Sequence, residues 1–178
     1  PSHDESFRRT FHRTMTQEVS EAAVLGAFDG RELGYGGLTA RMERADDGRF
    51  VVEVHDDAGA TLDRWTVARL VGSRRHQQLF TRDGDVWVRL PIAWDVEERR
   101  FFHLNGAFLT ADPEAREDGR IAEVDYLRHS VRWNDNCIFC HNVAPDPGLD
   151  ASGQRFDSNV AELGVACEAC HGPGDEHV

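Results

Sequence analysis

Residues 77–90 read Gln-Gln-Leu-Phe-Thr-Arg-Asp-Gly-Asp-Val-Trp-Val-Arg-Leu, and this stretch decides the fold class. Two runs of β-forming residues flank Asp83-Gly84, a pair typical of two-residue hairpin turns because both central residues adopt positive φ there. Side chains alternate across a strand, which places Val86 and Val88 on one face. The stretch therefore predicts an antiparallel hairpin.

The same signals extend outward from this hairpin over residues 33–109, where β-forming runs alternate with short Asp- and Gly-rich turns. We predict an antiparallel β meander of about six strands, within an α+β fold. The expected strands are 38–43, 50–54, 61–68, 77–82, 85–90 and 100–104. The expected organisation is a helical arm over 1–30, a β-rich region over 31–110 and a C-terminal region with loops and helices over 111–178.

Helices are expected in the two flanking regions. In the arm, Ser2 or Asp4 caps a first helix that runs through Phe7 and Phe11, and Ser20 caps a short second helix over 22–25. In the C-terminal region, apolar residues at helical spacing predict a helix over 121–133, and a shorter one is expected over 158–163.

Composition limits the classes of function. The 178 residues carry 20 basic and 32 acidic side chains, a net charge of −12. This balance argues against nucleic acid as a partner and fits a solvated acidic surface or a basic redox partner. No apolar run reaches the length of a membrane span. The chain begins at Pro1, and we expect it to be a fragment of a larger protein.

All four cysteines belong to two pentapeptides, Cys137-Ile-Phe-Cys140-His141 and, 30 residues later, Cys167-Glu-Ala-Cys170-His171. Each reads C-x-x-C-H, the attachment pattern of c-type haem. Two thiols at this spacing reach the two vinyl groups of one haem, and the adjacent histidine falls under the iron as its proximal ligand. The pattern predicts two covalent haems, with His141 and His171 as iron ligands.

Three alternatives stay open. C-x2-C, a gap and C-x2-C is close to zinc-ribbon spacing, so a structural zinc site on Cys137, Cys140, Cys167 and Cys170 is the main alternative. Such a site is either genuine or formed when zinc is trapped by a cytochrome fragment without haem. A disulfide pair is a second alternative. A multihaem reductase with one open iron position is a third, although an electron carrier is favoured over an enzyme.

Further histidines are candidates for the sixth position of the iron. His12 lies in an aromatic, threonine-rich segment, and His129 comes just ahead of the first cysteine pair. His76 opens the central hairpin beside Arg74 and Arg75, whose guanidinium groups match haem propionates geometrically. Each of these residues is equally compatible with an ordinary surface or helix position.

Three stretches resemble the multihaem cytochrome c family, which includes cytochrome c554-like proteins. They are Cys-Glu-Ala-Cys-His-Gly-Pro-Gly-x-x-His at 167–177, Asn-Cys-Ile-Phe-Cys-His-Asn at 136–142 and Thr-Phe-His-Arg-Thr-Met-Thr at 10–16. The resemblance implies that His141 and His171 are proximal ligands. It also nominates His177 and His12 as ligands from the opposite side of a haem.

These observations together predict an electron-transfer domain with two haem c groups held by histidines. Haem attachment takes place outside the cytoplasm, so we expect a periplasmic or extracellular protein. The expected partners are redox proteins or further haem domains of the same parent chain.

Overall fold

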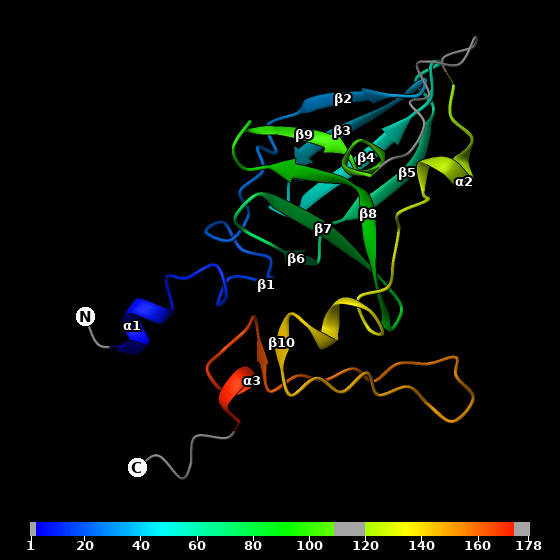
Figure 1. Ribbon diagram of the computed structural model, residues 1–178. Coiled ribbons are helices and arrows are strands. Elements are labelled where there is room, and N and C mark those ends of the chain that lie inside the picture. The colour runs from blue at the N-terminus through cyan, green and yellow to red at the C-terminus, as the bar shows by residue number, and fades with distance from the viewer. Residues whose placement is uncertain (1–2, 109–119, 173–178) are drawn as a thin grey trace.

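Two antiparallel sheets dominate the computed structural model, which describes residues 3–108 and 120–172 (Figure 1). One sheet has the order β2-β3-β4-β5, and the other has the order β1-β6-β7-β8-β9. The first comprises β2 (Arg31–Tyr35), β3 (Leu38–Arg44), β4 (Phe50–His55) and β5 (Thr61–Thr66). The second comprises β1 (Thr16–Glu18), β6 (Arg69–Val71), β7 (His76–Asp83), β8 (Val86–Asp95) and β9 (Arg100–His103). The predicted β-rich α+β fold is confirmed.

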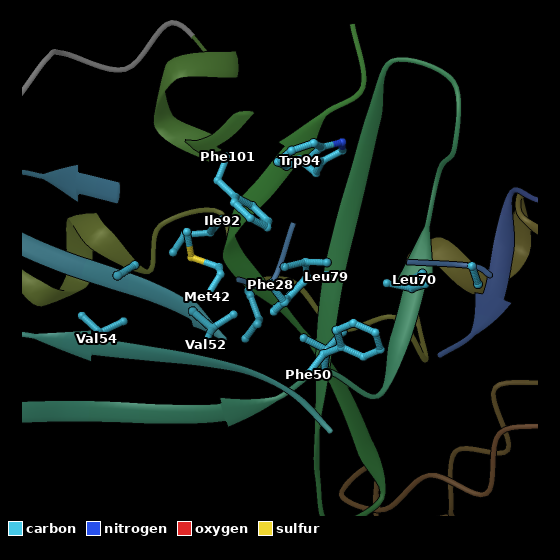
Figure 2. Close-up of a cluster of buried hydrophobic side chains, with 14 of the residues drawn as sticks. Phe28, Met42, Phe50, Val52, Val54, Leu70, Leu79, Ile92, Trp94 and Phe101 are labelled. Atoms are coloured by element: carbon cyan, nitrogen blue, oxygen red, sulfur yellow. The ribbon is translucent and has the colours of Figure 1, made fainter. Parts of the chain in front are cut away.

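The main core lies between the two sheets. Phe50, Val52 and Val54 point inward at every second position of β4, as expected for a half-buried strand. They meet side chains of the other sheet, among them Leu79 and Ile92, both fully buried (Figure 2). Sheet-to-sheet packing of this kind leaves the outer face of the five-stranded sheet available for the C-terminal region.

The central hairpin forms where it was predicted, with its turn shifted by one residue. Asp83 pairs with Val86, so the two turn residues are Gly84 and Asp85. Gly84 alone of these two has positive φ, at 58°. A register shift follows Gln78, opposite the β8 segment that contains Pro91, which has no amide hydrogen to donate to the ladder.

The N-terminal arm is less helical than predicted. Helix α1 covers only His3–Phe7, and the chain then turns into strand β1. The expected helix over 22–25 is a single turn, in which Ser20 caps the amide of Ala23. Val24 N still donates to Ser20 O at 3.0 Å, but the turn does not continue because Leu25 N donates to the buried side chain of Gln77 at 2.8 Å.

The helix predicted over 121–133 is also mostly absent. Helix α2 covers Glu123–Tyr126, and the chain then becomes extended. Residues 131–133 pair with the free edge of β8: Arg89 N donates to Val131 O at 2.9 Å, and Trp133 N donates to Trp87 O at 2.8 Å. Backbone pairing with an open strand edge outweighs the helical periodicity of this segment.

The two cysteine motifs are joined by a long antiparallel hairpin. Strands β10 (Asn142–Val143) and β11 (Glu162–Leu163) pair at its base, and bridges Asp146–Asn159 and Leu149–Phe156 continue the pairing outward. The helix predicted over 158–163 is therefore wrong, because this segment is one arm of the hairpin. Short helices η1 (Leu104–Ala107), η3 (Cys137–Phe139) and α3 (Glu168–His171) complete the described elements. None of the described helices is long and apolar enough to cross a membrane.

Asn134 fastens the C-terminal region to the tip of the β7–β8 hairpin. Its Oδ1 accepts from Trp87 N at 2.8 Å, and its Nδ2 donates to Asp85 O at 3.1 Å and to Ser158 Oγ at 2.9 Å. The side chain is fully buried. In Figure 1 the chain after α2, coloured yellow to red, runs to the end of the sheets that carries β1 and this tip.

Candidate haem-binding site

The first motif is held on the five-stranded sheet by its second residue. Ile138 is fully buried in a small core with Val71, Phe80 and Trp133. Its amide donates to Trp133 O at 3.0 Å, and its carbonyl accepts from Asn142 Nδ2 at 2.9 Å. The buried apolar residue between the two cysteines thus fixes both of them at the protein surface.

The two thiols of the first motif differ in exposure. Cys137 is half-buried against this small core, whereas Cys140 is exposed. Burial raises the pKa of the Cys137 thiol, and the guanidinium of Arg89 opposes this increase. Arg89 itself is half-buried and donates through Nε and Nη2 to His129 O, at 2.9 and 2.6 Å.

His141 is half-buried, and its backbone is tied to the N-terminal strand. Thr16 Oγ1 donates to His141 O at 3.0 Å. The ring atom Nδ1 is buried and has no hydrogen-bond partner among the described residues. Burial lowers the pKa of the ring, which favours the neutral imidazole that ligates iron. A neutral ring without a polar partner fits an axial ligand whose environment is completed by a prosthetic group.

The second motif is more exposed than the first. Cys167, Cys170 and His171 are all solvent-exposed, and α3 provides a single helical turn in which His171 N donates to Cys167 O at 3.0 Å. The turn is preceded by Gly164, which has φ of 79°. A Cβ at Gly164 would overlap the carbonyl oxygen of Arg13, so glycine permits the arm to lie against the motif.

The arm is bound to this segment by hydrogen bonds as well. Val165 N donates to His12 O at 2.9 Å. Arg13 Nη1 donates to Leu163 O, and its Nη2 lies 3.5 Å from Glu162 Oε2. Residues about 150 positions apart in the sequence are thereby placed side by side.

Both motifs border one cavity of about 680 Å³. Cys140 of the first motif and Cys170 of the second lie in its wall. This volume falls within the range typical of cofactor pockets. Most of the remaining wall is apolar: Phe139, Val143, Pro145, Ala161, Val165 and Ala169. A mainly apolar hollow with one thiol from each motif fits flat apolar groups attached through these cysteines.

A zinc site on the four cysteines receives no support. No group of three or more His, Cys, Asp or Glu side chains with metal-binding geometry occurs within residues 3–108 and 120–172. A structural zinc site needs four ligands that converge on one centre. None of the four cysteines is paired in a disulfide in this structure.

The other predicted histidines lie in different places. His12 is exposed, with its backbone against the second motif. His76 contacts β8 and β9: its Nε2 is 3.5 Å from Asp95 Oδ2, and its ring centroid is 4.8 Å from that of Phe102. The ring of His129 stacks on Phe108 at 4.0 Å. His177 lies outside the described residues.

The two predicted propionate partners, Arg74 and Arg75, are exposed. The guanidinium of Arg74 lies 5.7 Å from the ring centroid of Phe11 in the N-terminal arm. Neither arginine borders the cavity that the two motifs share.

Sequence reasoning missed an arginine between two tryptophans behind the first motif. The guanidinium of Arg69 lies 4.0 Å from the ring centroid of Trp87 and 4.1 Å from that of Trp133, and it pairs with Glu18 at 3.0 Å. Its Nε and Nη1 are buried without a hydrogen-bond partner within the described chain, so the aromatic faces are their main contact. No local pattern marks this group, because its members come from β1, β6, β8 and the segment before the first motif.

Comparison with known proteins identifies a solved structure with a similar fold. No protein-family model and no curated protein sequence matches the chain. Among solved structures, the chain is similar to the outer cell wall cytochrome OcwA, with a TM-score of 0.54 and 17% sequence identity. The match covers 99% of this chain and 30% of that one, so this chain spans less than a third of the length of OcwA. The chain therefore has the fold of one region of a cell wall cytochrome.

Proposed function

We propose that this chain is an electron-transfer region of a multihaem c-type cytochrome, with one haem on each C-x-x-C-H motif. The observation that carries the proposal is the shared cavity, because it brings Cys140 and Cys170 to one apolar hollow although they are 30 residues apart. The likeness to the fold of a cell wall cytochrome supports it.

The chain's own residues have distinct roles in this proposal. Cys137 and Cys140 hold one haem through thioether bonds, and Cys167 and Cys170 hold the other. His141 and His171 would ligate the iron atoms, and His12 and His177 are proposed as further ligands. When bound, the haems supply reversible one-electron chemistry at iron. The mainly apolar wall of the cavity, in which Glu162 and Glu168 are the charged members, would pack against the flat faces of the haems.

The arm has a supporting role. Because His12 O accepts from Val165 N, the segment around His12 is positioned next to the second motif. This placement supports His12 as a ligand delivered from the N-terminal side. A periplasmic or extracellular location follows from the attachment chemistry, and the expected partners are redox proteins or other haem domains of the same parent chain.

The test is production of the chain in the periplasm of a host with haem-attachment machinery. The mass of the denatured protein should exceed the apo mass by two haems, and the reduced protein should show the sharp absorption bands of low-spin haem. Cys137→Ala/Cys140→Ala and Cys167→Ala/Cys170→Ala should each retain one haem. His55→Ala, in β4 away from both motifs, is the matched control and should retain two.

A colourless protein with the apo mass from this host would contradict the proposal. Stoichiometric zinc in that colourless protein would favour the structural zinc alternative.

A further inference from the structure

The two motifs sit in electrostatically different surroundings, although they share one cavity. In the first motif Cys137 and His141 are half-buried and Cys140 is exposed, whereas Cys167, Cys170 and His171 of the second are all exposed. In a haem protein, burial disfavours the more highly charged oxidised iron, and a nearby fixed positive charge does the same. Both effects raise the reduction potential.

Arg89 provides that fixed charge at the first motif. Its guanidinium interacts electrostatically with Cys137 and is held by His129 O and by Gln78 Oε1, which accepts from Nη1 at 3.1 Å. Its acceptors within the described chain are neutral groups, so no carboxylate cancels the charge. A half-buried cation is screened by solvent less than an exposed one.

The other charges around the first motif largely cancel. Asp135, which also acts on Cys137, is paired with Arg132. Arg69, behind Trp133, is paired with Glu18. Of the charged side chains that act on Cys137, Arg89 is therefore the one cation without a carboxylate partner among the described residues, whereas Glu162 and Glu168 line the shared cavity and face both sites.

Among the described residues, positive and negative side chains beside Cys167 are equal in number. The charged residues that line the small cavity beside Cys167 are two arginines and two glutamates: Arg8, Arg13, Glu162 and Glu168. Arg13 is paired with Glu162, and Glu168 lies inside the motif itself. Arg8, Glu162 and Glu168 are exposed, so solvent and salt screen them.

We propose that the haem at the first motif has the higher reduction potential of the two, and that Arg89 is the residue that sets this order. The proposal rests on the proposed function. With haems bound, Cys167, Cys170 and His171 would hold the site that gives up one electron, Cys137, Cys140 and His141 would hold the site that accepts it, and no proton or bond would change. The pair is directional, with the exposed site receiving electrons and the half-buried site holding them.

The test is spectroelectrochemical titration of the two-haem chain and of its Arg89→Gln, Arg89→Lys and Arg99→Gln variants. The unaltered chain should show two one-electron waves. Arg89→Gln should lower the upper wave and leave the lower one in place. Arg89→Lys should restore the upper wave, because it keeps the charge while losing the forked hydrogen bonds to His129 O. Arg99→Gln removes an exposed charge from the β8–β9 turn, at the opposite end of β8, and should move neither wave.

Single-haem variants assign the waves. Cys167→Ala/Cys170→Ala retains the first haem and should show the higher potential, and Cys137→Ala/Cys140→Ala should show the lower one. If these variants do not bind haem, the titrations of the Arg89 variants in the two-haem chain still test the proposal.

Several outcomes overturn the inference. A reversed order of the two potentials would overturn it, and so would a single unresolved wave. An upper wave that Arg89→Lys lowers as much as Arg89→Gln would also overturn it, because the effect would then come from structure and not from charge. Two attached haems with any of these results leave the proposed function intact, whereas failure of haem attachment overturns both.

Discussion

The hydroxyl of Thr16 donates to the backbone carbonyl of His141 over 3.0 Å, so the first strand of the chain is bonded directly to the histidine of the first motif. Thr16 is 1% exposed, and water cannot replace this bond. Thr16→Val keeps the shape of the side chain and leaves the carbonyl unpaired. We expect a loss of about 1 kcal/mol in the free energy of unfolding, measured by urea titration.

Thr39→Val is the control for this change. Thr39 lies in β3, and its hydroxyl makes no hydrogen bond to the described residues. An equal loss in both variants would show that the Thr16–His141 bond contributes nothing specific.

Gly164 allows the N-terminal arm to approach the second motif. Gly164→Ala introduces strain at a φ of 79° and a clash with the Arg13 carbonyl. Gly59→Ala has nearly the same φ, 80°, and open space around the new methyl. The strain alone costs roughly 1–2 kcal/mol in each variant. We expect a larger loss in the free energy of unfolding for Gly164→Ala, together with faster proteolysis of the arm. Equal losses and equal proteolysis in the two variants would show that contact with the arm does not stabilise this motif.

Asn134 is expected to be the main polar tie between the sheets and the C-terminal region. Asn134→Ala leaves the buried amide of Trp87 without its acceptor and removes two further bonds, which should cost about 1–3 kcal/mol per unsatisfied group. Hydrogen exchange should increase in 142–163. Asn159→Ala, an exposed hairpin position whose Oδ1 accepts from Val160 N, should change stability by less than about 0.5 kcal/mol. Unchanged exchange in the hairpin would refute the expectation.

His103 should make the fold sensitive to mild acid. Its Nδ1 accepts from Asn105 N and its Nε2 donates to Tyr126 O, so the ring is neutral, and burial lowers its pKa from 6.5 to about 4. The unfolded chain therefore binds more protons between these two values, and stability falls as pH decreases from about 6.5 to about 4. The contribution is at most about 3 kcal/mol, and it is absent below the lower value.

His103→Gln can still donate to Tyr126 O but does not titrate. The difference in unfolding free energy between the two proteins should shrink as pH falls from 7 to 4.5, because only the unaltered protein loses this contribution, on the order of 1 kcal/mol per pH unit. A constant difference across that range would contradict the role assigned to His103.

The strands could be predicted from the sequence because their signals are local. The six expected strands correspond to β3, β4, β5, β7, β8 and β9, where β-branched and aromatic residues alternate between turn residues. Three strands of the two sheets were not predicted: β1 and β6, whose three residues each carry too little pattern, and β2 (Arg31–Tyr35), which contains Gly34. The helices expected over 121–133 and 158–163 failed for another reason: their backbone groups pair with β8 and with the other arm of the hairpin. Such pairing depends on residues that are distant in the sequence, whereas hydrophobic periodicity is assessed within a single segment.

The residues of the candidate site also fall into those that a local sequence pattern identifies and those that it does not. The thiols and histidines of the two motifs are adjacent in the chain, so a local pattern identifies them. The role proposed for Arg89 depends on an electrostatic interaction with Cys137 across 48 positions, and that of Thr16 on a hydrogen bond to His141 across 125. Neither residue carries a local signal that distinguishes it from any other arginine or threonine in a strand.

The hairpin between the motifs has a consequence for the distance over which they communicate. Because β10 and β11 pair at its base, the separation of the motifs is set by the ladder register and not by the number of residues between them. The tip around Asp150 and Arg155 projects away from the cavity wall, and residues added or removed there leave the base unchanged. The number of residues between the two cysteine pairs therefore does not determine the distance between the motifs, which under the proposed function is the distance that an electron would cross.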